Sequence, residues 1–410
     1  MIAPNDAHQP EVRAVAKRVF ALIRPDVLTW ARESAGVSVA AAAETLVVEE
    51  EVLLAWERDD GKPSIPQLRK LATLYKRPLS VFYLQAVPKG FQVISDFRRL
   101  GESSGPFSPE LTQEIRFAHQ RRELALELLA DLGEKPTRFA SKASTNEDAE
   151  VVGARLRARL GIDDQMRRFV PDAEGRNALN TWRQAAEAAG VLVFQSTRIA
   201  ATEASGFALA FADLPVVVVN RKDPVTRRLF SLAHELAHLM LQTSGVSDLR
   251  LDEEVPLADI EVERFCNQVA AAALMPRGLI EADQTLKVHG AANEWSDAEI
   301  ASMSRRFGVS REALLLRLLN FQRTSKVFFA SKRAQYAAEY QRQRQLAANK
   351  PKDPQPRNMP QEAIGTLGRS FITLVLGNYY QDRLTLSEVS SYLGLRTKHV
   401  EKLQAEMRAA

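Results

Sequence analysis

The sequence predicts a mainly α-helical protein with one small β-sheet, flanked by all-helical modules at both ends. Two observations lead to this fold class. Short amphipathic segments punctuated by Gly36 and Gly61 fill residues 27–84, and helical periodicity dominates most of the remaining chain. Short apolar runs rich in β-branched and aromatic residues, typical of strands, lie close together near the middle, at 191–196, 206–211 and 215–220.

The overall composition is that of a soluble globular protein. The chain has 410 residues, enough for two to four domains, with 45% hydrophobic and 26% charged residues and a net charge of +4. Its single cysteine, Cys266, excludes an intramolecular disulfide and the cysteine-rich zinc fingers. The N-terminus lacks an apolar signal region, and no run approaches the roughly 18 apolar residues of a membrane span. We therefore expect a cytoplasmic protein without membrane contact.

The chain divides into five segments. The helical block with its N-terminal extension forms residues 1–90, and a connector at 91–147 contains a long helix at about 110–132 and a polar linker. A central domain at 148–325 holds the strands. A helix and a proline-rich linker follow at 326–360, and a small helical module closes the chain at 361–410.

Within the central domain, helices are expected near 148–160 and 176–189, before the strands. A further helix begins near residue 226, after Asp223-Pro224. The next helix runs from about 259 to 274 and ends before Pro276. These last two helices carry the residues that indicate chemistry.

The helix that begins near 226 contains the sequence SLAHELAHLML at 231–241. Residues four apart on a helix lie about 40° apart around its axis, so His234 and His238 project from one face and can reach one metal ion. Glu235 is rotated by about 100° and is placed to act on a water beside the metal. This is the HExxH pattern of zinc peptidases. The alternative is a core helix with two incidental histidines, although imidazoles without partners are costly to bury.

A third ligand must come from elsewhere, because two histidines hold zinc poorly. The following helix offers Glu263, with Asn267 four residues later on the same face to orient a ligand. Glu261 is the rival, but it faces another direction. Glu253 and Glu254 are interpreted as solvated loop carboxylates, and Cys266 as a small buried core residue.

FSLAHELAHLML followed by ERFCNQVAAAALMP resembles the ImmA/IrrE metallopeptidase domain over roughly residues 150–320. The resemblance implies a zincin-like α+β peptidase fold, with His234, His238 and Glu263 as zinc ligands and Glu235 as the catalytic acid and base. Val269 stands in a triplet that is Phe-Ala-Ala in many members. The expected function is peptide-bond hydrolysis by Zn²⁺ and Glu235. A strand at 216–220, taken as an edge strand, is expected to hold an extended substrate by strand addition, through Val216, Val217, Val218, Val219 and Asn220.

Residues 27–84 resemble the XRE-type helix-turn-helix domain, through ARESAG, AAAETL and VLLAWE followed by KPSIPQLRKLATLYKRPLSVFYL. Such domains insert the helix expected here at about 49–56 into the DNA major groove. This helix begins with Glu49, Glu50 and Glu51, which oppose binding to a polyanion. We expect weak DNA binding at most, and interpret the domain as a protein-interaction or dimerisation unit that is compatible with a homodimer.

Two other segments have the spacing of helices and turn that is typical of helix-turn-helix motifs. Residues 299–320 are expected to pack on the peptidase core. Residues 384–404 carry basic side chains in their second helix and are the more suited to DNA, although a solvated basic face explains them equally well. Those side chains are Arg396, Lys398, His399 and Lys402.

The family resemblance implies a proteolytic switch that cleaves an XRE-type repressor in a bacterial stress-response, mobile-element or defence system. The alternative is a DNA-binding regulator or antitoxin-like protein in which the peptidase domain acts as a sensor. A glutamate at position 235 argues against an inactive enzyme.

Overall fold

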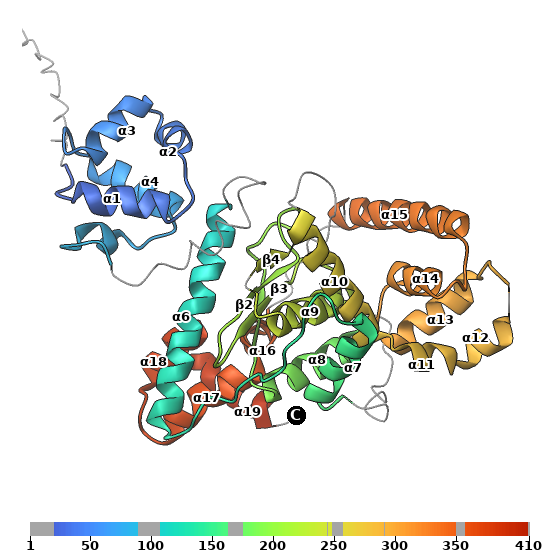
Figure 1. Cartoon of the computed structure of the whole chain (residues 1–410). Coiled ribbons are helices and arrows are strands. Elements are labelled where there is room, and N and C mark those ends of the chain that lie inside the picture. The colour runs from blue at the N-terminus through green and yellow to red at the C-terminus, as the bar shows by residue number, and fades with distance from the viewer. Residues whose placement is uncertain are drawn as a thin grey trace, which may run out of the picture. The chain divides into compact units, whose positions relative to one another are not determined.

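The structure is a computed structural model that describes residues 20–88, 107–162, 175–243, 245–247, 257–290, 292–349 and 357–408. The described residues form two compact units, the first made of 20–88 and 107–113 and the second of the residues from 114 onward. Figure 1 labels their helices and strands.

The first unit contains the short helices that the sequence predicts for 27–84. They are α1 (Pro25–Glu33), α2 (Val39–Leu46), α3 (Glu50–Glu57), α4 (Ile65–Leu74) and the 3-10 helix η1 (Leu79–Tyr83). Ser38 caps α2, and Ser64 forms a capping box with Gln67 on α4, so local hydrogen bonds define where these helices start. Their apolar faces enclose a core around Leu28, Leu53 and Leu68.

Residues 107–113, which begin the long helix α6 (Pro109–Asp131), belong to this first unit. Gly36 has a φ of 68°, and a Cβ there would lie 2.8 Å from the carbonyl oxygen of Phe107. Lys76 forms an ion pair with Glu110 at 3.1 Å. The start of α6 is therefore needed to complete the N-terminal unit.

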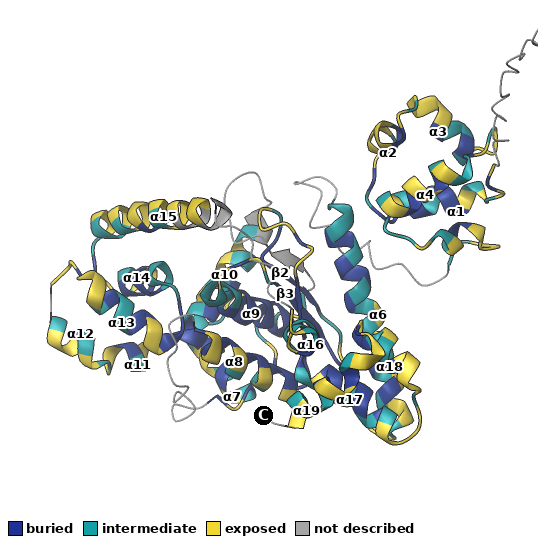
Figure 2. Ribbon diagram, turned by 180° about the vertical axis from the view of Figure 1, so that it is seen from behind, coloured by how far each residue is buried: buried dark blue, intermediate teal, exposed yellow. Residues whose placement is uncertain are grey.

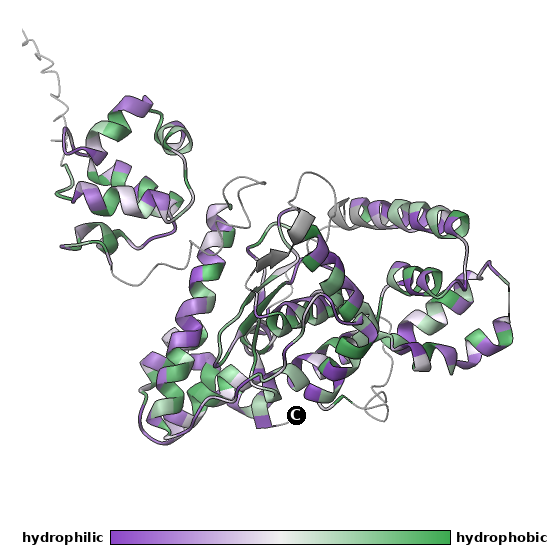
Figure 3. Ribbon diagram, viewed as in Figure 1, coloured by the Kyte–Doolittle hydropathy of each residue, from purple (hydrophilic) through white to green (hydrophobic). Residues whose placement is uncertain are grey.

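The second unit is built on one mixed sheet with the strand order β1-β3-β2-β4. The strands β1 (Leu192–Ser196), β2 (Gly206–Leu209) and β3 (Val216–Asn220) lie where the sequence predicts them, and β4 (Gly245–Ser247) is additional. β1 is parallel to β3, whereas β2 is antiparallel to both β3 and β4. Every residue of β1, β2 and β3 is buried, and these strands carry apolar colour in Figure 3.

The expectation that 216–220 is an edge strand is wrong. β3 is central: Val216–Asn220 pair with β1 on one side, and Val216–Val219 pair with β2 on the other. Its backbone groups are thus engaged on both sides, and it cannot receive a substrate by strand addition. The edges of the described sheet are β1 and β4.

Four helices pack around the sheet and on one another: α7 (Ala149–Arg159), α8 (Arg176–Ala188), α9 (Val225–Met240) and α10 (Leu257–Leu274). α9 contacts β2 and β3, α8 contacts β1, and α10 packs on both α7 and α9. A Cβ at Gly153 in α7 would lie 2.8 Å from the Cβ of Ala272, so the lack of a side chain allows α7 and α10 to approach closely. This packing fixes α10 beside the central helix α9.

Five more helices follow: α11 (Arg277–Glu281), α12 (Gln284–His289), α13 (Asp297–Phe307), α14 (Arg311–Asn320) and α15 (Lys326–Asn349). Ile300 and Leu314 join the same hydrophobic core as Leu232 of α9, which confirms the expectation that 299–320 packs on the core of the central domain. α15 is largely exposed beyond its contacts with α14 (Figure 2). The proline-rich linker lies mostly outside the described residues.

The last helices are α16 (Met359–Leu367), α17 (Arg369–Tyr380), α18 (Leu386–Leu393) and α19 (Val400–Arg408), with the 3-10 turn η2 (Thr397–His399) before α19. α16 packs against β1, and Phe371 of α17 meets Phe194 edge to face at 5.7 Å. The buried Arg183 donates hydrogen bonds to the carbonyl oxygens of Ile364 and Gly365.

The predicted boundaries at 147/148, 325/326 and 360/361 therefore do not separate compact units. Residues from 114 onward form one unit, because both flanking segments bury side chains on the central domain. The expected linker at 133–147 packs Phe139 and Ala143 against the core, and the amide of Ala143 donates to the carbonyl of Met240. Among the described helices, none is both long and apolar enough to cross a bilayer.

Candidate metal centre

The helix α9 presents the HExxH residues in the interior of the second unit. Pro224 precedes it in an extended conformation, with ψ of 150°, and the helix continues without interruption to Met240. His234 and Glu235 are 0% exposed and His238 is 3% exposed. Polar groups buried this deeply require partners, and α10 supplies one to both histidines.

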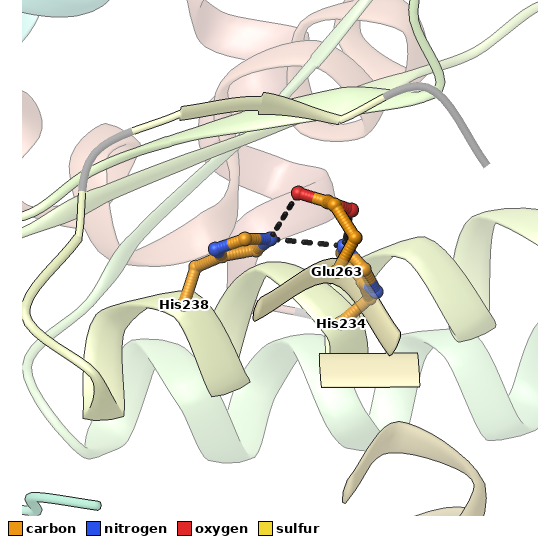
Figure 4. A group of neighbouring side chains, drawn as sticks. All are labelled: His234, His238 and Glu263. Carbon is orange, nitrogen blue, oxygen red and sulfur yellow. Dashed lines mark hydrogen bonds and ion pairs between the residues drawn. The ribbon is translucent and has the colours of Figure 1, made fainter. Parts of the chain in front are cut away.

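Glu263 of α10 lies against both histidines, as Figure 4 shows. Its Oε2 is 3.1 Å from His234 Nε2, and its Oε1 is 3.1 Å from His238 Nε2. The two Nε2 atoms are 3.0 Å apart. Three ligand atoms thus converge on one point, and they can hold a metal ion.

The protonation of Glu263 suits a cation site. Burial alone would raise its pKa, but hydrogen bonds from His234 and His238 lower the pKa to about 2. Burial lowers the pKa of His234, which favours the neutral imidazole that binds metals. Two nitrogens and one carboxylate oxygen form the donor set of catalytic zinc sites, which leave a fourth position open. The residues present therefore fit a zinc ion.

Other side chains hold the ligands in orientation. The Oγ1 of Thr243 lies 3.2 Å from His238 Nδ1, and the Thr243 hydroxyl also donates to the His238 carbonyl oxygen. Asn267, which the sequence predicts as an orienting residue, interacts with His234 and raises its pKa against the effect of burial. Such contacts fix the ring orientation of a ligand. Thr243 has no signal in the sequence that would single it out.

Cys266 is a core residue, as the sequence predicts, because it is 0% exposed within the main hydrophobic cluster. It also lies beside His238. Burial would lower the pKa of that imidazole, whereas hydrogen bonds with Cys266 and Glu263 raise it. Glu261, the rival third ligand, is exposed and is not part of the cluster, while Glu253 and Glu254 lie outside the described residues.

Glu235 lies beneath the strand β2. A Cβ at Gly206 would be 3.2 Å from Glu235 Oε1 and 2.7 Å from the carbonyl oxygen of Val218. Gly206 thus allows the carboxylate to lie directly against the sheet. The only signal for it in the sequence is a glycine inside a strand pattern, which indicates a close backbone approach.

β4 is the edge strand on the side of this site. Its Ser247 pairs with Gly206, the residue that contacts Glu235. β4 pairs with β2 and with no other strand in the described part of the sheet. Among the described strands, the edge strand beside this site is therefore β4 and not β3.

Comparisons with known proteins agree with this geometry. Residues 186–319 match the IrrE N-terminal-like domain of the M78 peptidases, a segment that contains His234, Glu235, His238 and Glu263. The chain is also similar to the radiation response metalloprotease IrrE of Deinococcus deserti, with 33% identity over 105 residues. That match covers 25% of this chain and 35% of the relative, so the chain spans about a third of the length of the curated relative it matches. The match to the peptidase family model thus covers the segment that holds the cluster.

Proposed function

We propose that this protein is a zinc-dependent endopeptidase that acts as a proteolytic switch. The observation that carries the proposal is the convergence of His234, His238 and Glu263 at 3.0–3.1 Å, next to the buried Glu235. When bound, zinc polarises the scissile carbonyl and lowers the pKa of water. The match of residues 186–319 to a peptidase family model and the similarity of the chain to a metalloprotease support this chemistry.

Glu235 is the group that moves the proton. It follows His234 directly on α9, so its carboxylate lies beside the three ligands and not among them. It accepts a proton from the attacking water and then delivers it to the leaving amine. Its burial keeps bulk water away from the carboxylate, and Gly206 leaves it room against β2.

The substrate binds as an extended segment along β4. Within the described sheet, β4 is the edge strand next to Gly206 and Glu235, whereas β1, the other edge strand, contacts α16. Backbone hydrogen bonds to β4 hold the peptide in register, and cleavage then requires an unfolded or exposed stretch in the target.

The substrate that the proposal names is a helix-turn-helix repressor of the XRE type, located in the bacterial cytoplasm, whose cleavage releases its genes. The basis is the similarity of the chain to a radiation response metalloprotease, together with the sequence resemblance of residues 27–84 to XRE domains. A stress-response, mobile-element or defence system is the expected setting.

The test is incubation of the zinc-loaded full chain with purified candidate repressors, followed by mass spectrometry of the fragments. Cleavage that depends on metal and is lost in Glu235→Gln supports the proposal. Stable repressors under all conditions, with zinc bound at His234, His238 and Glu263, contradict it.

A second candidate is a DNA-binding regulator or antitoxin-like protein in which the metal site senses a signal. It is favoured by the exposed cations near the C-terminus, Arg396, Lys398 and Lys402. Expression of the regulated genes in cells that carry Glu235→Gln distinguishes the two functions. The variant abolishes release of the genes if the protein is a protease, and leaves regulation intact if it is a DNA-binding sensor.

A further inference from the structure

A tight turn and the 3-10 turn η2 join the last two helices, α18 and α19. α18 ends at Gly394, which has a φ of 62°, and the amide of Leu395 donates to the carbonyl of Ser390 at 3.0 Å. The Ser390 hydroxyl donates to the Leu395 carbonyl, so the turn is closed by hydrogen bonds in both directions. Thr385 and Glu388 form a capping box that defines the start of α18. Five apolar side chains of this pair are buried: Val389, Leu393, Leu395, Val400 and Leu403.

This arrangement is similar to that of a helix-turn-helix motif, in which a short glycine-containing turn joins two helices and the second helix presents its N-terminal residues outward. Here the three residues Gly394 to Arg396 lead into the 3-10 turn η2, which continues into α19. Here Val400 and Leu403 face inward, and α19 packs on α16 and α17. The opposite side of α19 is exposed (Figure 2).

Three exposed cations surround the start of α19: Arg396 in the turn before it, Lys398 in η2 and Lys402 in α19 itself. Within the described residues, none of the three forms an ion pair with an acidic side chain. Glu401 is also exposed, but Glu388 accepts hydrogen bonds from Thr385, and Glu406 accepts them from Asn358 and Gln361. Glu388 and Glu406 are therefore hydrogen-bonded to neighbours, whereas Arg396, Lys398 and Lys402 form no ion pair with a described acid.

The N-terminal unit has the opposite charge in the comparable position. Residues 38–58, which cover α2 and α3, contain the basic Arg58 and five acids: Glu44, Glu49, Glu50, Glu51 and Glu57. Residues 383–402 contain two acids, Glu388 and Glu401, and the basic residues Arg383, Arg396, Lys398 and Lys402. Of the two helical pairs, the C-terminal one is the one suited to a polyanion.

We propose that the α18–α19 pair binds duplex DNA, with the start of α19 entering the major groove. Arg396 and Lys398 precede the first turn of α19, and Lys402 lies within that turn, so all three reach phosphates or base edges on one approach. A single helix fits the major groove of B-form DNA, whereas the major groove of A-form RNA is too deep and narrow. The proposal is independent of the peptidase function.

The test is a fluorescence anisotropy titration of the full chain against a random-sequence DNA duplex and a double-stranded RNA of the same length, at several salt concentrations. The triple variant Arg396→Gln, Lys398→Gln, Lys402→Gln is expected to lose at least about tenfold in affinity for DNA. The slope of log K against log salt should also become shallower by about 2 to 3, since each phosphate contact contributes about 0.9.

A matched control changes three exposed cations elsewhere in the same unit: Lys287→Gln, Arg305→Gln, Arg323→Gln. It removes the same charge and should leave DNA affinity within about twofold. Glu235→Gln should bind DNA as the unmodified chain does, which separates this proposal from the protease. Thermal unfolding of each variant shows that it is folded. Absence of DNA binding, an equal loss in the control, or tighter binding of the RNA duplex would overturn the proposal.

Discussion

Gly206 of β2 lies directly against Glu235 of α9, and the space between them would not accept a side chain. A Cβ at position 206 would be 3.2 Å from Glu235 Oε1 and 3.5 Å from its Cγ. The same atom would be 2.7 Å from the carbonyl oxygen of Val218, a backbone atom that cannot rotate away. The position of the proposed proton-transfer group therefore depends on a glycine that the HExxH motif does not contain.

Replacing Gly206 with alanine should displace Glu235 relative to the three metal ligands. We expect kcat to fall on the order of 10²-fold with a smaller change in KM, because a displacement of about 1 Å at a reacting group has an effect of this size. Zinc content should stay at one ion per chain, since His234, His238 and Glu263 do not contact this position. Steady-state kinetics and metal analysis check both points.

Gly278→Ala is the control, because a Cβ at Gly278 meets no atom within 4 Å. It should leave kcat and KM unchanged. A Gly206→Ala enzyme with normal kcat would show that Glu235 tolerates the displacement, and loss of zinc in that variant would indicate wider damage to the site.

Glu263→Gln should bind zinc poorly. The substitution removes the charge of the only carboxylate in the cluster and leaves two histidines, which are too few for a stable zinc site. Glu261→Gln, two residues earlier on the exposed side of α10, should retain one zinc per chain. Metal analysis after dialysis against a weak chelator measures the difference, and full occupancy in Glu263→Gln would refute the ligand assignment.

Glu235→Gln should keep zinc and stability but lose cleavage by at least about 10²- to 10⁴-fold, because an amide cannot accept the proton of the attacking water. The fully buried position allows an isosteric replacement without a change in packing. Fragment analysis by mass spectrometry, beside metal analysis of the same sample, measures both properties. Cleavage at the normal rate would exclude Glu235 as the base.

The stability of the second unit should decrease at acidic pH, in part through His119 on α6. Its ring packs edge to face on Phe211, and no described residue accepts or donates a hydrogen bond at its Nε2. Burial, followed by the nearby Arg122, lowers the pKa of His119 to about 4. Below about pH 6.5, His119 therefore binds a proton in the unfolded chain but stays neutral in the folded chain. The free energy of unfolding decreases as the pH falls toward 4.

Urea unfolding midpoints at pH 7.5 and 5.0 test this effect. The decrease between the two should be smaller in His119→Phe, which cannot be protonated, than in the unmodified chain. His399→Phe, at a partly exposed position, serves as the control and should not alter the decrease. An identical pH dependence in all three proteins would contradict the role of His119.

The sequence predicts those features that depend on local spacing. Side-chain periodicity predicts the helices, the three strands and the placement of His234 and His238 on one helix face. The bounds of these helices and strands in the structure agree with the prediction to within a few residues. The position of Glu263 on the next helix predicts it as the third metal ligand, and in the structure its carboxylate oxygens lie 3.1 Å from both histidines.

Features that depend on strand order or on distant packing could not be predicted. Val216–Val219 would be β-branched and apolar in a central strand or in an edge strand alike. Only the pairing of β3 with both β1 and β2 shows that it is central. β4 has three residues, too few to show alternation. The packing of 361–410 on β1 depends on contacts such as Arg183 with Gly365, 182 residues apart in the chain.

The N-terminal unit should bind duplex DNA no better than about 10⁻⁴ M at physiological salt, the weak end of non-specific binding. Glu49, Glu50 and Glu51 are exposed at the start of α3, the helix that would enter the groove, and they repel phosphates. A fragment of residues 1–113 is suitable for the test, because Phe107 and Glu110 pack on this unit.

Changing the three glutamates to glutamine should strengthen binding in an anisotropy titration. The control Glu33→Gln, Asp59→Asn, Asp60→Asn removes the same charge from other exposed positions and should have a smaller effect. Tight binding by the unmodified fragment would show that α3 is not the helix that faces DNA, whereas self-association or binding to a basic protein would fit its acidic surface.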